Sequence, residues 1–75
     1  MKRYLLVKQA RNELNMTQAE FGEMLDVGLQ EVSKWERNII NIPKPRLALL
    51  YFYYNRKSTA GRLKCDIAKA LVFGV

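Results

Sequence analysis

The side chains with the clearest chemistry in this sequence are its cations, which can pair with phosphates and carboxylates. Thirteen Lys and Arg residues outnumber seven Asp and Glu residues, so the 75-residue chain carries a net charge of +6 at pH 7. The excess lies in two segments, because residues 1–14 carry four bases and one acid and residues 34–69 carry nine bases and two acids. Residues 15–33 between them carry four acids and no base. This distribution favours a polyanionic partner, with nucleic acid ahead of a membrane surface.

The sequence offers little for catalysis or metal binding. It contains no histidine and one cysteine, Cys65, so it has neither a Cys/His zinc set nor a pair of thiols for an internal disulfide. We expect Cys65 to be a small, half-buried helix residue rather than a reactive thiol. There is also no glycine-rich phosphate loop and no nucleophile with a matching base. We therefore expect no enzymatic activity, no cofactor and no metal.

Length and composition are typical of one small globular domain over residues 1–75. The hydrophobic fraction is 49%, which is enough for a single core but leaves little interior. No run of eighteen apolar residues could cross a membrane, and the apolar stretch near the N-terminus is too short for an export signal. We therefore expect no membrane association and a cytoplasmic protein.

Helical spacing of apolar residues predicts an all-α fold, a compact bundle of four to five helices. The predicted helices cover about residues 2–14, 18–25, 29–37, 46–54 and 62–73. Thr17 and Glu20 form a Thr-x-x-Glu capping box at the start of the second helix. Residues 55–61 read as a connector, and residues 71–73 could form a short strand instead of the end of a helix.

Residues 17–37 meet the conditions for a helix-turn-helix, in which two short helices are joined by a tight turn. Gly22 supplies the small residue that the second helix needs where the third crosses it. Asp26, or Gly28 nearby, supplies a residue that accepts a positive φ in the turn. The seam between the helices has apolar residues at the required offsets, namely Phe21, Leu25, Val27, Val32 and Trp35.

The segments MTQAEF at residues 16–21 and VSKWER at residues 32–37 resemble the Cro/C1-type helix-turn-helix family. Lambdoid phage repressors, Cro proteins and XRE-like bacterial regulators belong to it. The resemblance covers residues 3–54 and implies a lambda repressor-like fold and sequence-specific binding of double-stranded DNA in transcription regulation. It also implies that helix 29–37 enters the major groove and that the protein acts as a repressor, binding a palindromic operator as a homodimer.

The resemblance also implies roles for individual positions. The base-contacting candidates are Leu29, Gln30, Ser33 and Lys34, and the phosphate-contacting candidates are Gln18, Arg37, Lys44 and Arg46. Gln30 could pair with adenine, Lys34 could donate to guanine, and Leu29 could touch a thymine methyl group. Arg11 and Glu36 match a partly buried structural salt bridge between the first and third helices.

Three features depart from the family pattern. Gly28 stands where a Ser or Thr N-cap is preferred, and Glu31 places an acid on the helix face that should approach DNA. The loop over residues 38–44 is longer than usual and contains Ile39, Ile40 and Ile42, for which the family offers no role.

The fourth helix and the C-terminal segment contain more apolar residues than a monomer of this size can bury, which indicates an interface. We expect a homodimer formed through the fourth helix and an extension over residues 55–75. The candidate interface residues are Leu49, Tyr53, Leu71, Val72 and Phe73. The alternative is an antitoxin-type or other protein-interaction module, whose hydrophobic C-terminal segment binds a partner protein.

Overall fold

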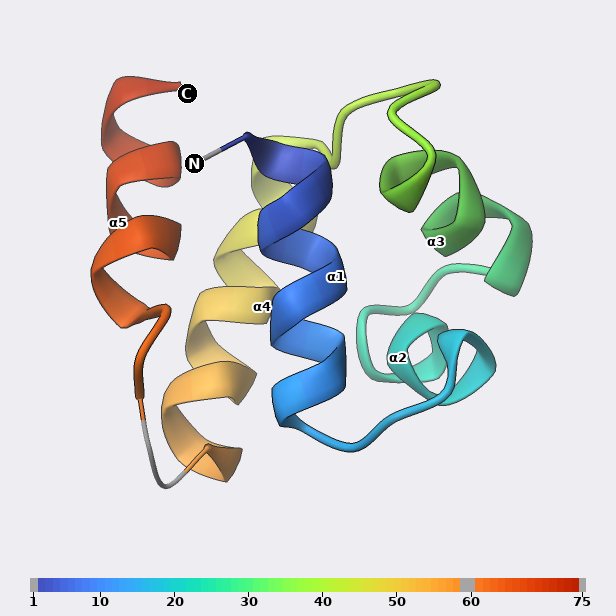
Figure 1. Ribbon diagram of the computed structural model, residues 1–75, viewed down its shortest axis with the longest axis horizontal. Coiled ribbons are helices and arrows are strands. Elements are labelled where there is room, and N and C mark those ends of the chain that lie inside the picture. The colour runs from blue at the N-terminus through green and yellow to red at the C-terminus, as the bar shows by residue number, and fades with distance from the viewer. Residues whose placement is uncertain (1, 59–60, 75) are drawn as a thin grey trace.

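Five helices and no strand make up the residues described by the computed structural model, which are residues 2–58 and 61–74. The helices are α1 (Arg3–Glu13), α2 (Gln18–Met24), α3 (Leu29–Glu36), α4 (Lys44–Lys57) and α5 (Lys64–Phe73). Figure 1 shows α1 in the middle of the bundle, with α2 and α3 on one side and α4 and α5 on the other. The predicted all-α class is confirmed, and the C-terminal segment that could have been a strand is helical as far as Phe73.

Local signals at the helix ends work as the sequence predicts. The Thr17 side chain accepts a hydrogen bond from the Glu20 amide at 3.1 Å, and the Glu20 carboxylate accepts one from the Thr17 amide at 2.9 Å. Asn15, Asp26 and Asn38 adopt positive φ angles of 56°, 60° and 60°, so each ends its helix in a left-handed conformation. These signals separate α1, α2 and α3 as predicted.

Helix α4 is longer than the predicted 46–54. It begins at Lys44, with Pro45 in its first turn, and continues to Lys57, so part of the predicted connector is helical. Two physical effects favour this extension. Arg56 and Lys57 place positive charge at the negative end of the helix dipole, and the Arg56 guanidinium lies 5.2 Å from the centre of the Phe52 ring. Of the predicted connector and extension, residues 59–60 and 75 lie outside the described residues.

The core is drawn from all five helices and one loop. Its largest fully buried side chains include Trp35, Phe21 and Tyr54, and Ile42 of the loop before α4 is fully buried among them. Three residues of α1 complete the centre of the bundle: Leu6, Val7 and Ala10. One apolar loop residue thus has a structural role that the sequence did not reveal.

Helix α5 is attached to the bundle by both packing and hydrogen bonds. Ile67 is fully buried, and the Tyr54 hydroxyl accepts a hydrogen bond from the Leu63 amide at 3.0 Å. The same hydroxyl donates to Glu13 Oε1 at 2.5 Å, so it joins α1, α4 and the start of α5. Cys65 is exposed on α5, which corrects the expectation that it is half-buried. Within the described residues, every helix is too short or too polar to cross a membrane.

Candidate nucleic-acid interface

The turn between α2 and α3 lies directly against Gly22. The Val27 amide donates a hydrogen bond to the Gly22 carbonyl at 2.8 Å. A Cβ atom at position 22 would lie 2.8 Å from the Val27 carbonyl oxygen and 3.3 Å from that of Gly28. The sequence therefore predicted correctly that a small residue is needed at position 22. It attributed this need to the crossing of α3, whereas the backbone of the turn at Val27 and Gly28 leaves no room for a side chain.

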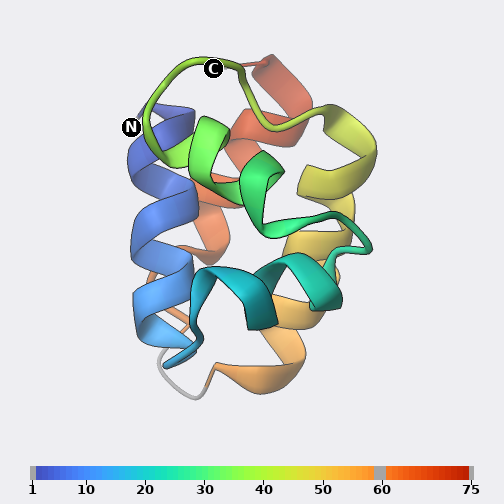
Figure 2. The same cartoon turned by 90° about the vertical axis from the view of Figure 1, so that its right-hand side faces the viewer.

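An apolar seam holds α2 and α3 together beneath their outer surface. Phe21, Leu25 and Val32 are fully buried, Trp35 is 1% exposed, and Val27 is half-buried at the turn. Burial of this side of α3 leaves the opposite side exposed to solvent. Figure 2 shows α2 and α3 together on one face of the molecule.

The exposed side of α3 presents the side chains that the resemblance assigns to base contacts. Leu29 is 48% exposed, Gln30 and Lys34 are exposed, and Ser33 is half-buried. Gln30 and Lys34 are four residues apart and therefore project from the same side of the helix. The structure thus brings an amide and an ammonium group together on the outer surface of α3.

A nearly buried ion pair orients α3 relative to α1. Arg11 Nε lies 2.6 Å from Glu36 Oε2 and Arg11 Nη2 lies 3.1 Å from Glu36 Oε1, so the contact is bidentate. The Arg11 side chain is 19% exposed and that of Glu36 is 4% exposed. The hydrogen bond to Glu36 raises the pKa of Arg11 above its ordinary value, against the opposing effect of burial.

Gln18 belongs to the same network. Its side-chain Nε2 donates a hydrogen bond to Glu36 Oε1 at 3.3 Å, and the residue is half-buried. The resemblance assigned Gln18 to a phosphate contact and Glu36 to the ion pair, without linking the two. In the structure Glu36 holds both Arg11 and Gln18, so a single carboxylate positions the start of α2 relative to the end of α3.

Basic side chains continue the surface beyond the end of α3. Arg37 is exposed, and its Nε donates a hydrogen bond to Ser33 Oγ at 3.1 Å. Lys44 is exposed at the first position of α4, and Arg46 is half-buried two residues further on, within the first turn of that helix. The sequence did not indicate the contact made by Arg3, whose Nη1 donates to the Ile42 carbonyl at 2.9 Å and attaches the loop to α1.

Two residues at the start of α3, Gly28 and Glu31, depart from the family pattern. Gly28 is the N-cap residue and provides no side-chain hydrogen bond to the helix. Glu31 lies in the first turn, where its charge is favourable to the helix dipole, and it is half-buried. Its position there gives Glu31 a role in helix stability that does not depend on DNA.

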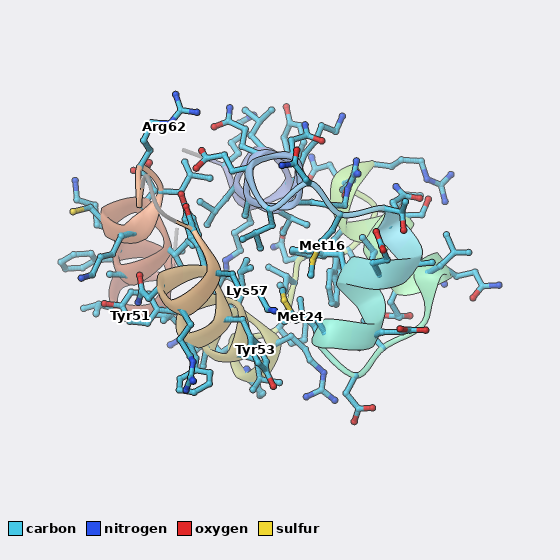
Figure 3. The ribbon with its side chains drawn as sticks, turned by 90° about the horizontal axis from the view of Figure 1, so that it is seen from below. Met16, Met24, Tyr51, Tyr53, Lys57 and Arg62 are labelled. Carbon is cyan, nitrogen blue, oxygen red and sulfur yellow. The ribbon has the colours of Figure 1, made fainter. Side chains whose placement is uncertain are left out.

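The residues predicted to form the homodimer interface lie on different parts of α4 and α5. Val72 and Phe73 are 72% and 73% exposed, whereas Leu49, Tyr53 and Leu71 are half-buried against the core. Figure 3 shows Tyr51 and Tyr53 extending from different sides of α4. The most exposed apolar side chains of α5 are therefore at its C-terminal end.

A family model described as Helix-turn-helix matches residues 7–51 of the chain, which is more than half of its length. Searches of curated proteins and of solved structures find no match. The matched segment begins in α1, contains the whole of α2, the turn and α3, and ends within α4. The resemblance seen in the sequence is thereby confirmed, and the chain belongs to the Cro/C1-type helix-turn-helix family of DNA-binding transcription regulators.

Proposed function

We propose that this protein is a transcriptional repressor that binds a palindromic operator as a homodimer, with α3 in the major groove. The observation that carries the proposal is the exposed side of α3, where Gln30 and Lys34 project while the opposite side is packed into the seam. Because the seam and the Arg11–Glu36 pair hold α3 rigidly, little conformational freedom would be lost on binding. The net charge of +6 favours association with a polyanion.

The side chains on α3 can distinguish bases by the groups that they present. The Gln30 amide both donates and accepts, which suits the N6 and N7 atoms of adenine. The Lys34 ammonium suits the O6 and N7 acceptors of guanine, and Leu29 offers an apolar surface to a thymine methyl group. The Ser33 hydroxyl already accepts a hydrogen bond from Arg37 Nε, and its own hydrogen would be the group that it offers to a base.

Phosphate contacts would position α3 and supply much of the affinity. Arg37 and Lys44 are exposed and lie at the two ends of the loop between α3 and α4. Arg46 extends this basic surface along α4, and Gln18 could add a contact from α2 through the part of its amide that Glu36 does not occupy. Binding through these groups should weaken steeply as salt concentration rises.

A homodimer would place two copies of α3 in successive major grooves, about 34 Å apart. We assign its interface to α4 and to the extension over residues 55–75, within a single domain over residues 1–75. Support comes from the exposed Val72 and Phe73 at the end of α5. Leu71 is half-buried next to them, and Leu49 and Tyr53 are half-buried on α4. Such a regulator would act in the cytoplasm, where it can reach bacterial or phage DNA.

Selection of bound duplexes from a random DNA pool tests this function most directly. We expect an enriched inverted repeat whose half-sites are separated by about one helical turn. Failure to enrich any sequence would contradict specific DNA binding. Enrichment of a single site without two-fold symmetry would contradict the dimeric operator complex but not DNA binding.

The exposure of Val72 and Phe73 also favours a second function, that of an antitoxin-type module. In that case the end of α5 would bind a partner protein, and DNA binding would regulate the genes for both. Co-purification of one defined partner, abolished by Val72→Ser combined with Phe73→Ser, would support it. If the chain associates only with itself and the double variant becomes monomeric, the homodimer is favoured instead.

A further inference from the structure

Two exposed isoleucines follow α3, and neither contributes fully to the core. Ile39 is 57% exposed and Ile40 is 40% exposed, whereas Ile42 is fully buried. The burial of Ile42 explains why that position is apolar. It leaves the adjacent exposed pair, two β-branched side chains on a loop beside α3, without a role in folding.

The backbone of this pair is tied to α3. Asn38 adopts a left-handed conformation, and the amides of Ile39 and Ile40 both donate to the Lys34 carbonyl, at 3.0 and 3.4 Å. On the far side of the pair, Arg3 donates to the Ile42 carbonyl at 2.9 Å. The loop is therefore held at both ends, and its position relative to Lys34 is set before a partner binds. Figure 2 shows this segment, in yellow-green, arching beside one end of α3.

The charges around the pair indicate what kind of surface it meets. Arg37 precedes the pair, Lys44 and Arg46 follow it, and residues 37–46 contain no acid. A second copy meeting this loop across a two-fold axis would bring like charges together, which is unfavourable. DNA matches the whole loop, because phosphates would pair with the cations and deoxyribose rings and base edges would contact the apolar side chains.

We propose that Ile39 and Ile40 pack against deoxyribose and base edges of the DNA beside the half-site read by α3. They lie between a phosphate bound by Arg37 and one bound by Lys44. The proposal rests on the proposed DNA-binding function and adds to it an apolar contact that is insensitive to hydrogen-bonding pattern.

The test compares affinities of the full chain for its selected duplex over a range of salt concentrations. Ile39→Ala combined with Ile40→Ala should weaken binding about tenfold, through loss of apolar contact area. The slope of log K against log salt should be unchanged, because no cation is removed. Ile39→Val combined with Ile40→Val should bind nearly as tightly as the parent chain. Asn41→Ala, an exposed polar change in the same loop, is the matched control and should bind like the parent.

Three results would overturn the proposal. The first is parental affinity in the double alanine variant. The second is a fall in its thermal stability large enough to explain weaker binding, which would make the pair structural. The third is loss of self-association by the free double variant in sedimentation, which would assign the pair to a second copy. Failure of the parent chain to bind any duplex is a distinct result, since it would remove the DNA-binding function together with this contact.

Discussion

Arg11 and Glu36 form a bidentate ion pair that joins α1, in the middle of the bundle, to the end of α3. The pair spans 25 residues of sequence, and its closest atoms, Arg11 Nε and Glu36 Oε2, are 2.6 Å apart. Glu36 also accepts a hydrogen bond from Gln18, so the carboxylate contacts side chains from both α1 and α2. Since the Glu36 side chain is 4% exposed, its carboxylate takes hydrogen bonds from these two side chains in place of water.

Arg11→Ala should therefore destabilise the fold by about 3 kcal/mol, because it leaves the Glu36 carboxylate buried without its cation. Arg11→Met combined with Glu36→Met should recover much of that loss, and chemical denaturation measures both. The raised pKa of Arg11 contributes stability that is fully present at neutral pH and lost only as strongly alkaline pH deprotonates the guanidinium. A stability loss confined to the range from pH 6 to 9 would contradict this assignment.

Gly22→Ala should destabilise the protein by about 2 kcal/mol, although alanine normally favours a helix. The added Cβ would lie 2.8 Å from the Val27 carbonyl oxygen, which is backbone and cannot move aside without opening the turn. Gly28→Ser is the matched control. Its Cβ would meet only the flexible Gln30 side chain at 3.4 Å, and its hydroxyl can cap α3. Equal unfolding midpoints for Gly22→Ala and the parent chain would show that the turn is not tightly packed.

Much of the helix-turn-helix could be predicted from sequence because its signals are local. The capping box at Thr17 and Glu20, and the left-handed residues Asn15, Asp26 and Asn38, act within a few positions along the chain. The Arg11–Glu36 pair was expected only through the family resemblance, since spacing alone does not bring those residues together.

Contacts between distant segments could not be predicted in the same way. Arg3 and Ile42 are 39 positions apart, and Glu13 and Tyr54 are 41 positions apart, yet each pair is hydrogen-bonded. Such contacts depend on how whole helices pack, so no sequence spacing indicates them. The family resemblance indicated which side chains of α3 face outward, but it did not indicate that the loop after α3 is attached to Arg3.

Tyr54→Phe should destabilise the protein by about 1–3 kcal/mol, because it removes the acceptor for the buried Leu63 amide and the donor to Glu13. The loss should be concentrated in α5, which that hydroxyl joins to α1 and α4. Amide hydrogen exchange measures this as faster exchange in residues 64–73 than in α2 and α3. Tyr51→Phe, a change of the same size on α4 outside this network, should leave both stability and exchange nearly unchanged.

Val72→Ser combined with Phe73→Ser should convert the proposed homodimer to a monomer. Both side chains are more than 70% exposed, so the change removes interface area without disturbing the core. Sedimentation at tens of micromolar should show a dimer for the parent and a monomer for the variant. Leu5→Ser, an exposed apolar change on α1, is the control and should remain dimeric. A monomeric parent chain at that concentration would contradict the dimer.

Lys34→Ala and Lys44→Ala should weaken DNA binding in different ways, because only Lys34 lies on the exposed side of α3. Lys34→Ala should cost about 1–3 kcal/mol at the selected site and little at other sequences, so discrimination falls. Lys44→Ala should weaken binding to all sequences alike and reduce the magnitude of the salt slope by about one, as expected for a lost phosphate contact. Competition titrations against selected and scrambled duplexes separate the two. If Lys34→Ala and Gln30→Ala bind the selected site as tightly as the parent, α3 does not read bases through these side chains.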